Sequence, residues 1–140
     1  MGHAGLGPEI EAVVSAKPFS VAEQYARFIG RESVATGTVV MHHGRVKIPG
    51  KVLSEFAAVI LEALVEDVVD GLRLIAGEAA WNFQLHRILV IHRLGRVGPG
   101  DDVLLVVCSA ATRREAFAAC SWLVDEIKKE HLIRLQELPG

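Results

Sequence analysis

The stretch that decides the fold runs from Ile88 to Glu130 and reads ILVIHRLGRVGPGDDVLLVVCSAATRREAFAACSWLVDEIKKE. Its apolar runs at 85–92 and 103–108 predict two strands, and the glycine-rich segment between them predicts a turn. Thr112 and Glu115 have the spacing of a capping box, which predicts that a helix begins there. We expect one apolar stripe of this helix to pack on the strands, and its residues recur at helical spacing: Phe117, Cys120, Val124 and Ile127.

The chain before this stretch shows alternating strand and helix patterns. A short strand is expected over 10–14, and Ser20 with Glu23 predicts a second capping box at the start of a helix. That helix is expected to reach residue 29 and to stop at Gly30. Residues 36–46 are β-branched and alternating, which predicts another strand, closed by a turn at Pro49 and Gly50.

The middle of the chain fits either of two element types. Residues 56–62 read as a buried strand, although the alanines and leucines of 56–80 also favour helix. We expect a strand over 56–62 followed by a helix over 64–80. Together these elements predict an α+β fold with mainly antiparallel strands. Residues 1–9, with three glycines and a proline, predict a flexible tail before a single domain at 10–140.

Composition and charge exclude several classes of protein. The chain has 140 residues, of which 51% are hydrophobic and 23% are charged, so a folded core is expected and disorder is not. Its net charge of −2 argues against nucleic acid as a partner. The apolar run at 56–65 is interrupted by Glu62 and is shorter than the ~20 residues that cross a membrane. With no signal-peptide pattern at the N-terminus, we expect a cytoplasmic protein that binds no membrane.

Three familiar kinds of catalytic or binding site find no support in the sequence. The segment 95–102 has glycines but lacks the Lys-Ser/Thr of a phosphate loop and lies between two strands. His42 and His43 are adjacent, so on a strand they point to opposite faces and cannot chelate one metal ion. The two cysteines, Cys108 and Cys120, have no C-x-x-C spacing and are expected to be small buried hydrophobes. We expect neither a metal ion nor an organic cofactor.

Basic residues lie at both ends of the last predicted helix. Arg113 and Arg114 occupy the first turn, where free backbone N–H groups and guanidinium groups together can bind an anion. Two solvated arginines are an equally good interpretation. Lys128 and Lys129 lie in the last turn, where cations stabilise the helix dipole. Fifteen residues separate Arg113 from Lys128, which is about 22 Å of helix, so one compact pocket can use both only if two subunits contribute or the substrate is elongated.

These residues resemble a known family. The segments VIHRLGRVGPGDDVLLVV (90–107), SAATRREAFAAC (109–120) and DEIK (125–128) are similar to the large, catalytic subunit of molybdopterin synthase. KPFSVAE (17–23) and GTVVMHHGRVK (37–47) fit the opening helix and the first long strand of the same family. The resemblance covers roughly residues 13–137 and is weakest over 48–84.

The resemblance implies a fold, an activity and partners. The implied fold is of the α/β-hammerhead type, with a long C-terminal helix. The implied assembly is a homodimer that binds two copies of a small ubiquitin-like sulfur-carrier subunit, giving a heterotetramer. The carrier ends in Gly-Gly, and its thiocarboxylate gives sulfur to cyclic pyranopterin monophosphate in two transfers that form molybdopterin. Some basic residues of the pocket come from across the dimer.

The family's functional residues can be carried over one position at a time. The catalytic lysine falls on Lys128, which would act as the base or as the transient covalent acceptor of the carrier's C-terminus. An arginine that holds the substrate phosphate falls on Lys47, which keeps the charge but loses the bidentate fork. A His-Arg pair falls on Thr112 and Arg113, so the histidine is absent, and Thr112 is expected to cap the helix. The candidate anion-binding residues are therefore Lys47, Arg113, Arg114 and Arg134.

A second expected lysine is missing from the C-terminal segment. Leu135 stands at that position in the segment LIRLQE (132–137), and Arg134, one residue earlier, would point elsewhere if the segment is extended. The resemblance predicts a sulfurtransferase. The alternative is a dimeric binding module for the carrier that lacks the chemistry, and Leu135 is the feature that favours it.

Overall fold

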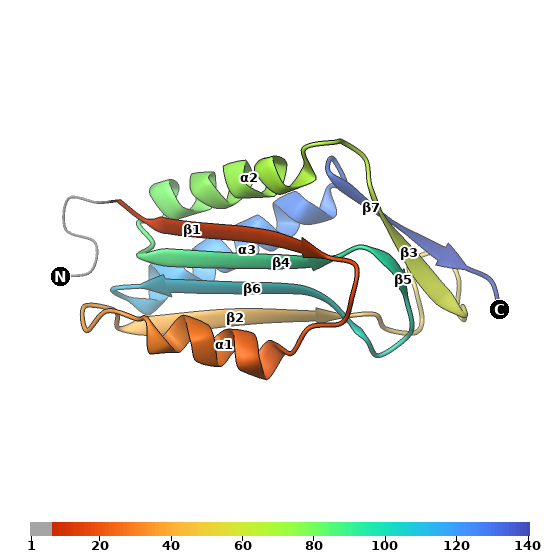
Figure 1. The fold of residues 1–140 in the computed structure, drawn as a ribbon, viewed down its shortest axis with the longest axis horizontal. Coiled ribbons are helices and arrows are strands. Elements are labelled where there is room, and N and C mark those ends of the chain that lie inside the picture. Colours follow the sequence, from red (N-terminus) through yellow and green to blue (C-terminus); the bar gives the residue numbers. More distant parts are fainter. Residues whose placement is uncertain (1–6) are drawn as a thin grey trace.

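The computed structural model describes residues 7–140, so part of the predicted tail at 1–9 lies outside the described residues (Figure 1). The elements follow in this order: β1 (Glu9–Ser15), α1 (Val21–Gly30), β2 (Thr38–Arg45), β3 (Ala58–Ala63), α2 (Val68–Asn82), β4 (Arg87–Arg93), β5 (Gly95–Val97), β6 (Asp102–Ala110), α3 (Arg113–Lys128) and β7 (Ile133–Leu138). The predicted strands at 10–14, 36–46 and 56–62 and the predicted helix at 64–80 are confirmed within a few residues.

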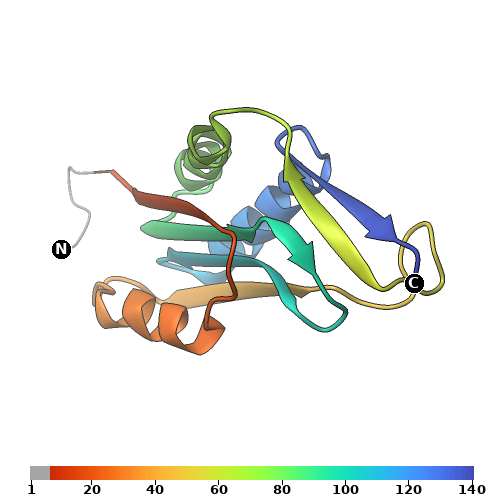
Figure 2. The same cartoon turned by 45° about the vertical axis from the view of Figure 1, so that its right-hand side comes forward.

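The strands form two sheets. The larger has the order β1-β4-β6-β2, in which only β1 and β4 are parallel. The smaller has the order β5-β3-β7 and is antiparallel throughout. Figure 2 shows the small sheet standing beside the C-terminal ends of β2 and β4. The predicted α+β class with mainly antiparallel strands is confirmed.

The helices divide between the two faces of the large sheet. Helix α1 covers one face, where Phe28 packs on Leu89, Ile91, Leu105 and Val107. Helices α2 and α3 cover the other face, and α3 packs on β6 and on the edge strand β2 (Figure 1). Successive residues of a strand point to opposite faces of the sheet, so they pack alternately against α1 and against α2 and α3.

The two predicted capping boxes have different outcomes. Ser20 caps α1 as predicted, because its hydroxyl accepts the backbone N–H of Glu23 at 3.1 Å. Thr112 occupies the N-cap position of α3, but its hydroxyl donates to the carboxylate of Glu115 and makes no bond to the backbone. The predicted capping box at 112–115 is therefore wrong, since the two side chains bond to each other.

Two further expectations need correction. Phe117 is 60% exposed and does not belong to the apolar stripe of α3. The stripe instead uses small side chains that let the helix approach the sheet closely, and its buried residues are Ala116, Ala119, Cys120, Leu123, Val124 and Ile127. The glycine-rich segment after β4 is more than a turn, since its first part forms β5 and pairs with β3. Short strands of this kind carry too few residues for an alternating pattern to predict them.

Candidate functional site

Helix α3 and strand β2 run in the same direction, which decides which cations lie together. Both run antiparallel to β6: β2 by its pairing, and α3 because it follows β6 directly and packs back on it. The starts of α3 and β2 are adjacent, since the backbone N–H of Gly37 donates to Ala110 O at 3.0 Å. The ends of the two elements therefore lie toward the same side of the molecule, where Figure 2 shows the small sheet.

Lys128 is the last residue of α3, and its side chain is exposed. Helix α3 packs on β2, and the Lys128 ammonium is one of the charges that lower the pKa of His42 on that strand. This face of α3 also carries Val124, one turn earlier, which is buried. Lys129 lies on another side and pairs with Glu126 at 2.6 Å. Of the two lysines in the last turn, the structure directs only Lys128 toward β2.

Lys47 follows the end of β2 and is exposed. Its Nζ donates to Pro49 O at 2.9 Å, so the side chain lies over its own loop. This loop is held by Glu137 of β7, whose carboxylate accepts the backbone N–H groups of Leu53, Lys51 and Val52 at 2.6, 2.7 and 3.2 Å. The bond from Leu53 is the main cause that lowers the pKa of Glu137, and the Lys47 ammonium adds to it.

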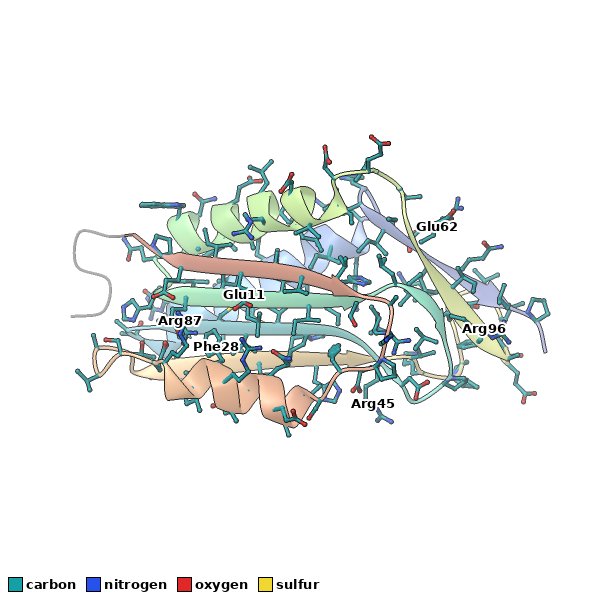
Figure 3. All side chains as sticks on the ribbon, viewed as in Figure 1. Glu11, Phe28, Arg45, Glu62, Arg87 and Arg96 are labelled. Carbon is teal, nitrogen blue, oxygen red and sulfur yellow. The ribbon has the colours of Figure 1, made fainter. Side chains whose placement is uncertain are left out.

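The other three candidate cations are placed differently. Arg113 and Arg114 are exposed at the start of α3, at the far end of the helix from Lys128. Arg134 lies on β7 and pairs with Glu62 of β3 at 2.6 Å, while the next residue, Leu135, is 38% exposed. Figure 3 shows Glu62 on the strand β3, in the small sheet. Within one chain, the structure brings Lys128 and Lys47 to the same end and leaves Arg113 and Arg114 at the other.

His42 is a residue that sequence reasoning did not place in the site. It faces α3, whereas His43 faces the opposite side and bonds to Asp102 at 2.6 Å, so the prediction that the two histidines point apart is confirmed. Burial lowers the pKa of His42, and the Lys128 and His43 charges lower it further. The signal that could have found His42 was its alternation with the two apolar residues Val40 and Val46, which predicts an inward-facing polar side chain.

The two cysteines are free and buried, as predicted. They lie against each other, Cys108 on β6 and Cys120 on α3, and the hydrogen bond between the thiols together with burial raises the pKa of Cys108. The Cys120 thiol also lies against the backbone of His42, so α3 packs over β2 at this residue. Between residues 7 and 140, the His, Cys, Asp and Glu side chains form no group of three or more that could hold a metal ion.

A cavity of about 300 Å³ lies elsewhere, between the end of α1 and the strands β1 and β4. Arg87 lines it, is 5% exposed and donates to Phe28 O at 2.6 Å. Its guanidinium lies 4.0 Å from the centre of the Phe28 ring, and it pairs with Glu32 at 3.3 Å (Figure 3). This network ties α1 to the sheet at the end opposite to Lys128.

Comparison with known proteins agrees with this architecture. The family model described as "MoaE protein" matches residues 14–130. The molybdopterin synthase catalytic subunit of Pyrococcus abyssi is 34% identical over 121 residues, which cover 86% of this chain and 79% of the relative. The Escherichia coli protein of the same name is 32% identical over 127 residues, covering 86% and 78% of the two chains.

Solved structures show the same fold. The molybdopterin synthase of Staphylococcus aureus superposes with a TM-score of 0.78 at 23% identity, covering 93% of this chain and 91% of that one. A complex of subunits 1 and 2 of the molybdopterin-converting factor of Helicobacter pylori superposes with a TM-score of 0.71 at 14% identity, covering 94% of this chain and 84% of that one. These likenesses define the class of protein, an α+β fold with a four-stranded and a three-stranded sheet. The chain belongs to the MoaE family, that of the molybdopterin synthase catalytic subunits.

The structure has no helix long and apolar enough to cross a membrane in the part of the chain that it describes.

Proposed function

We propose that this chain is a sulfurtransferase that completes molybdopterin, taking sulfur from the C-terminal thiocarboxylate of a small carrier protein and transferring it to cyclic pyranopterin monophosphate. The observation that carries the proposal is the placement of Lys128 and Lys47 at one end of the α3 and β2 layer. An exposed lysine at a helix end can act on an acyl group, and a second ammonium nearby can hold a phosphate or a developing negative charge.

Lys128 is the catalytic residue in this proposal. Its Nζ acts either as the base or as the acceptor of the carrier's acyl group, while the sulfur leaves with the pterin. Lys47 binds the anionic substrate. Glu137 holds the backbone of the Lys47 loop, and the ammonium group exchanges its bond to Pro49 O for the phosphate.

A dimer completes the site in this proposal. Arg113 and Arg114 begin a helix whose two ends are about 22 Å apart, so they serve the pocket of a second subunit and not their own. Arg134 is a weaker candidate for anion binding, because Glu62 already neutralises it at 2.6 Å. The partner is a small sulfur carrier, and the Helicobacter pylori structure, a complex of subunits 1 and 2 of the molybdopterin-converting factor, supports such an assembly.

Reconstitution tests the proposal. The protein is mixed with thiocarboxylated carrier and cyclic pyranopterin monophosphate, and molybdopterin is quantified after a single turnover. We expect product, and gel filtration is expected to show a complex with the carrier.

The second candidate is a binding module that forms this complex but has no chemistry. Leu135 favours it, because a neutral, partly exposed side chain stands where the resemblance implies a second lysine. An intact complex that yields no molybdopterin would select the binding module, and product would exclude it.

A further inference from the structure

The imidazole of His42 lies on the same side of the large sheet as Lys128. His42 pairs with Val106 of β6, whose side chain belongs to the core beneath α2 and α3. The backbone of His42 lies against the thiol of Cys120, a little more than two turns before Lys128 on α3. Strand β2 and helix α3 run in the same direction, so the end of β2 beyond His42 leads toward the end of α3.

Gly44 directs the ring toward that end. His42 and Gly44 lie on the same face of β2, and a Cβ built on Gly44 would be only 3.0 Å from His42 Nε2. The ring therefore lies over the bare backbone of Gly44, toward the C-terminal end of β2. Any larger residue at position 44 would displace it.

The charged surroundings of His42 are simple. The Lys128 ammonium on α3 and the neighbouring His43 on β2 both lower the pKa of His42, and the Cys120 thiol lies against the His42 backbone. Strand β6 carries one charged side chain, Asp102, which is bound by His43 on the other face. Among residues 7–140, neither ring nitrogen of His42 has a hydrogen-bond partner. Burial and the nearby positive charges keep the imidazole neutral at neutral pH, so one ring nitrogen is free to accept a proton.

We propose that His42 is the proton-transfer residue of the Lys128 site. The inference rests on the proposed function and specifies it further. The step begins when the carrier's sulfur is already bonded to the pterin, so the carrier's C-terminus is a thioester. The Lys128 ammonium first gives one proton to solvent, and the resulting amine attacks the acyl carbon: the carbon–nitrogen bond forms, the carbon–sulfur bond breaks, and the sulfur stays on the pterin. His42 takes the proton that the attacking nitrogen loses and gives it to the leaving pterin sulfur, so the imidazole is regenerated and protons balance.

Two variants of His42 and one matched control test this role in single-turnover assays against pH. His42→Gln keeps a polar side chain and His42→Phe keeps a ring, but neither can carry a proton. We expect both to lower the rate at neutral pH at least tenfold while carrier binding is unchanged. The unaltered protein should lose rate as the pH falls through the lowered pKa of His42 and the ring becomes protonated, and both variants should lack this acid limb.

The control is His43→Gln, which changes the adjacent histidine on the opposite face. It should keep the rate at neutral pH and still show an acid limb, which moves to higher pH because the His43 charge that lowers the pKa of His42 is removed. A His42→Gln protein with an unaltered rate and acid limb would overturn the role of His42 and leave the sulfurtransferase proposal standing. If the unaltered protein makes no molybdopterin, both proposals fall together.

An NMR titration of the His42 ring checks the geometry without any turnover. Lys128→Met should raise the pKa of His42, because a positive charge that opposes protonation is removed. Lys129→Met is the matched control and should leave it unchanged, since Lys129 pairs with Glu126. An unchanged His42 pKa in Lys128→Met would show that the two groups are not neighbours and would overturn the inference.

Discussion

Lys128 and Lys129 are adjacent in sequence but have different surroundings, and this contrast is the simplest test at the scale of single residues. Lys129 forms an ion pair with Glu126 at 2.6 Å, whereas the charge of Lys128 lowers the pKa of His42 on the neighbouring strand β2. We expect Lys128→Ala to lower molybdopterin formation by at least ~100-fold, since removal of a nucleophile or base commonly costs that much. Lys129→Ala should retain most activity. Equal losses in the two variants, measured at equal carrier occupancy, would contradict the assignment.

Glu137 is a second residue to test, because its negative charge stabilises the loop that carries Lys47. Its carboxylate accepts three backbone N–H groups, so its pKa is lower in the folded state than in the unfolded one. A carboxylate of this kind contributes stability at pH values above its unfolded pKa of about 4.3, and the contribution is lost as the pH falls through the lower folded value.

Hydrogen exchange measures this effect directly. In Glu137→Gln, the amides of Lys51, Val52 and Leu53 should exchange faster at neutral pH, because a neutral amide oxygen accepts more weakly than a carboxylate. The unaltered protein should approach the variant's behaviour, after correction for intrinsic exchange, once the pH is below the folded pKa of Glu137. Identical protection in both proteins at neutral pH would show that Glu137 does not hold the Lys47 loop.

Among the elements, the two helix starts differ in a way that unfolding measurements can resolve. Ser20 accepts the backbone N–H of Glu23, whereas Thr112 bonds to the Glu115 side chain. Ser20→Ala should therefore destabilise the protein by about 1 kcal/mol, the usual cost of losing an N-cap. Thr112→Ala should cost clearly less. Urea denaturation gives both values, and an equal cost would indicate that Thr112 caps α3 in solution.

Most elements could be predicted from the sequence because their patterns are local. The alternation in β2 and the capping box at Ser20 each depend on residues that are close in the chain. One residue of the predicted α3 stripe is wrong, since Phe117 is exposed, whereas Cys120, Val124 and Ile127 are buried as predicted. Ala116 and Ala119 complete the buried face. Hydrophobicity alone does not distinguish a large exposed side chain from a small buried one.

The site was less predictable, because it depends on which elements end together. The resemblance pointed to Lys47 and Lys128, but the direction of α3 along β2 is a property of the sheet order. His42 entered only through that packing, since nothing next to it in the sequence marks a partner on α3. The ion pair of Arg134 with Glu62 joins residues far apart in the chain, so the neutralisation of this candidate could not be foreseen.

At the scale of the whole molecule, the buried arginine network joins α1 to the large sheet. Arg87 is bound by Phe28 O and Glu32, and Ser109 donates to the same Glu32 oxygen at 3.0 Å. Arg87→Ala should destabilise the fold by roughly 3–5 kcal/mol, because it leaves Glu32 buried without its ion-pair partner. Thermal unfolding measures the loss. The double variant Arg87→Leu with Glu32→Leu should recover part of the lost stability. If Arg87→Ala alone costs clearly less than about 3 kcal/mol, Glu32 reaches solvent when its partner is removed.

Catalysis at a site shared between two copies of the chain is the central claim, and subunit mixing tests it most directly. Lys128→Ala and Arg113→Ala proteins are each assayed for molybdopterin formation and then unfolded, mixed in equal amounts and refolded together. Each alone should be nearly inactive. The mixture should recover about a quarter of the unaltered activity, because half of the randomly formed dimers are hybrids and each hybrid has one intact site. No recovery in a mixture shown to contain hybrid dimers would contradict the shared site.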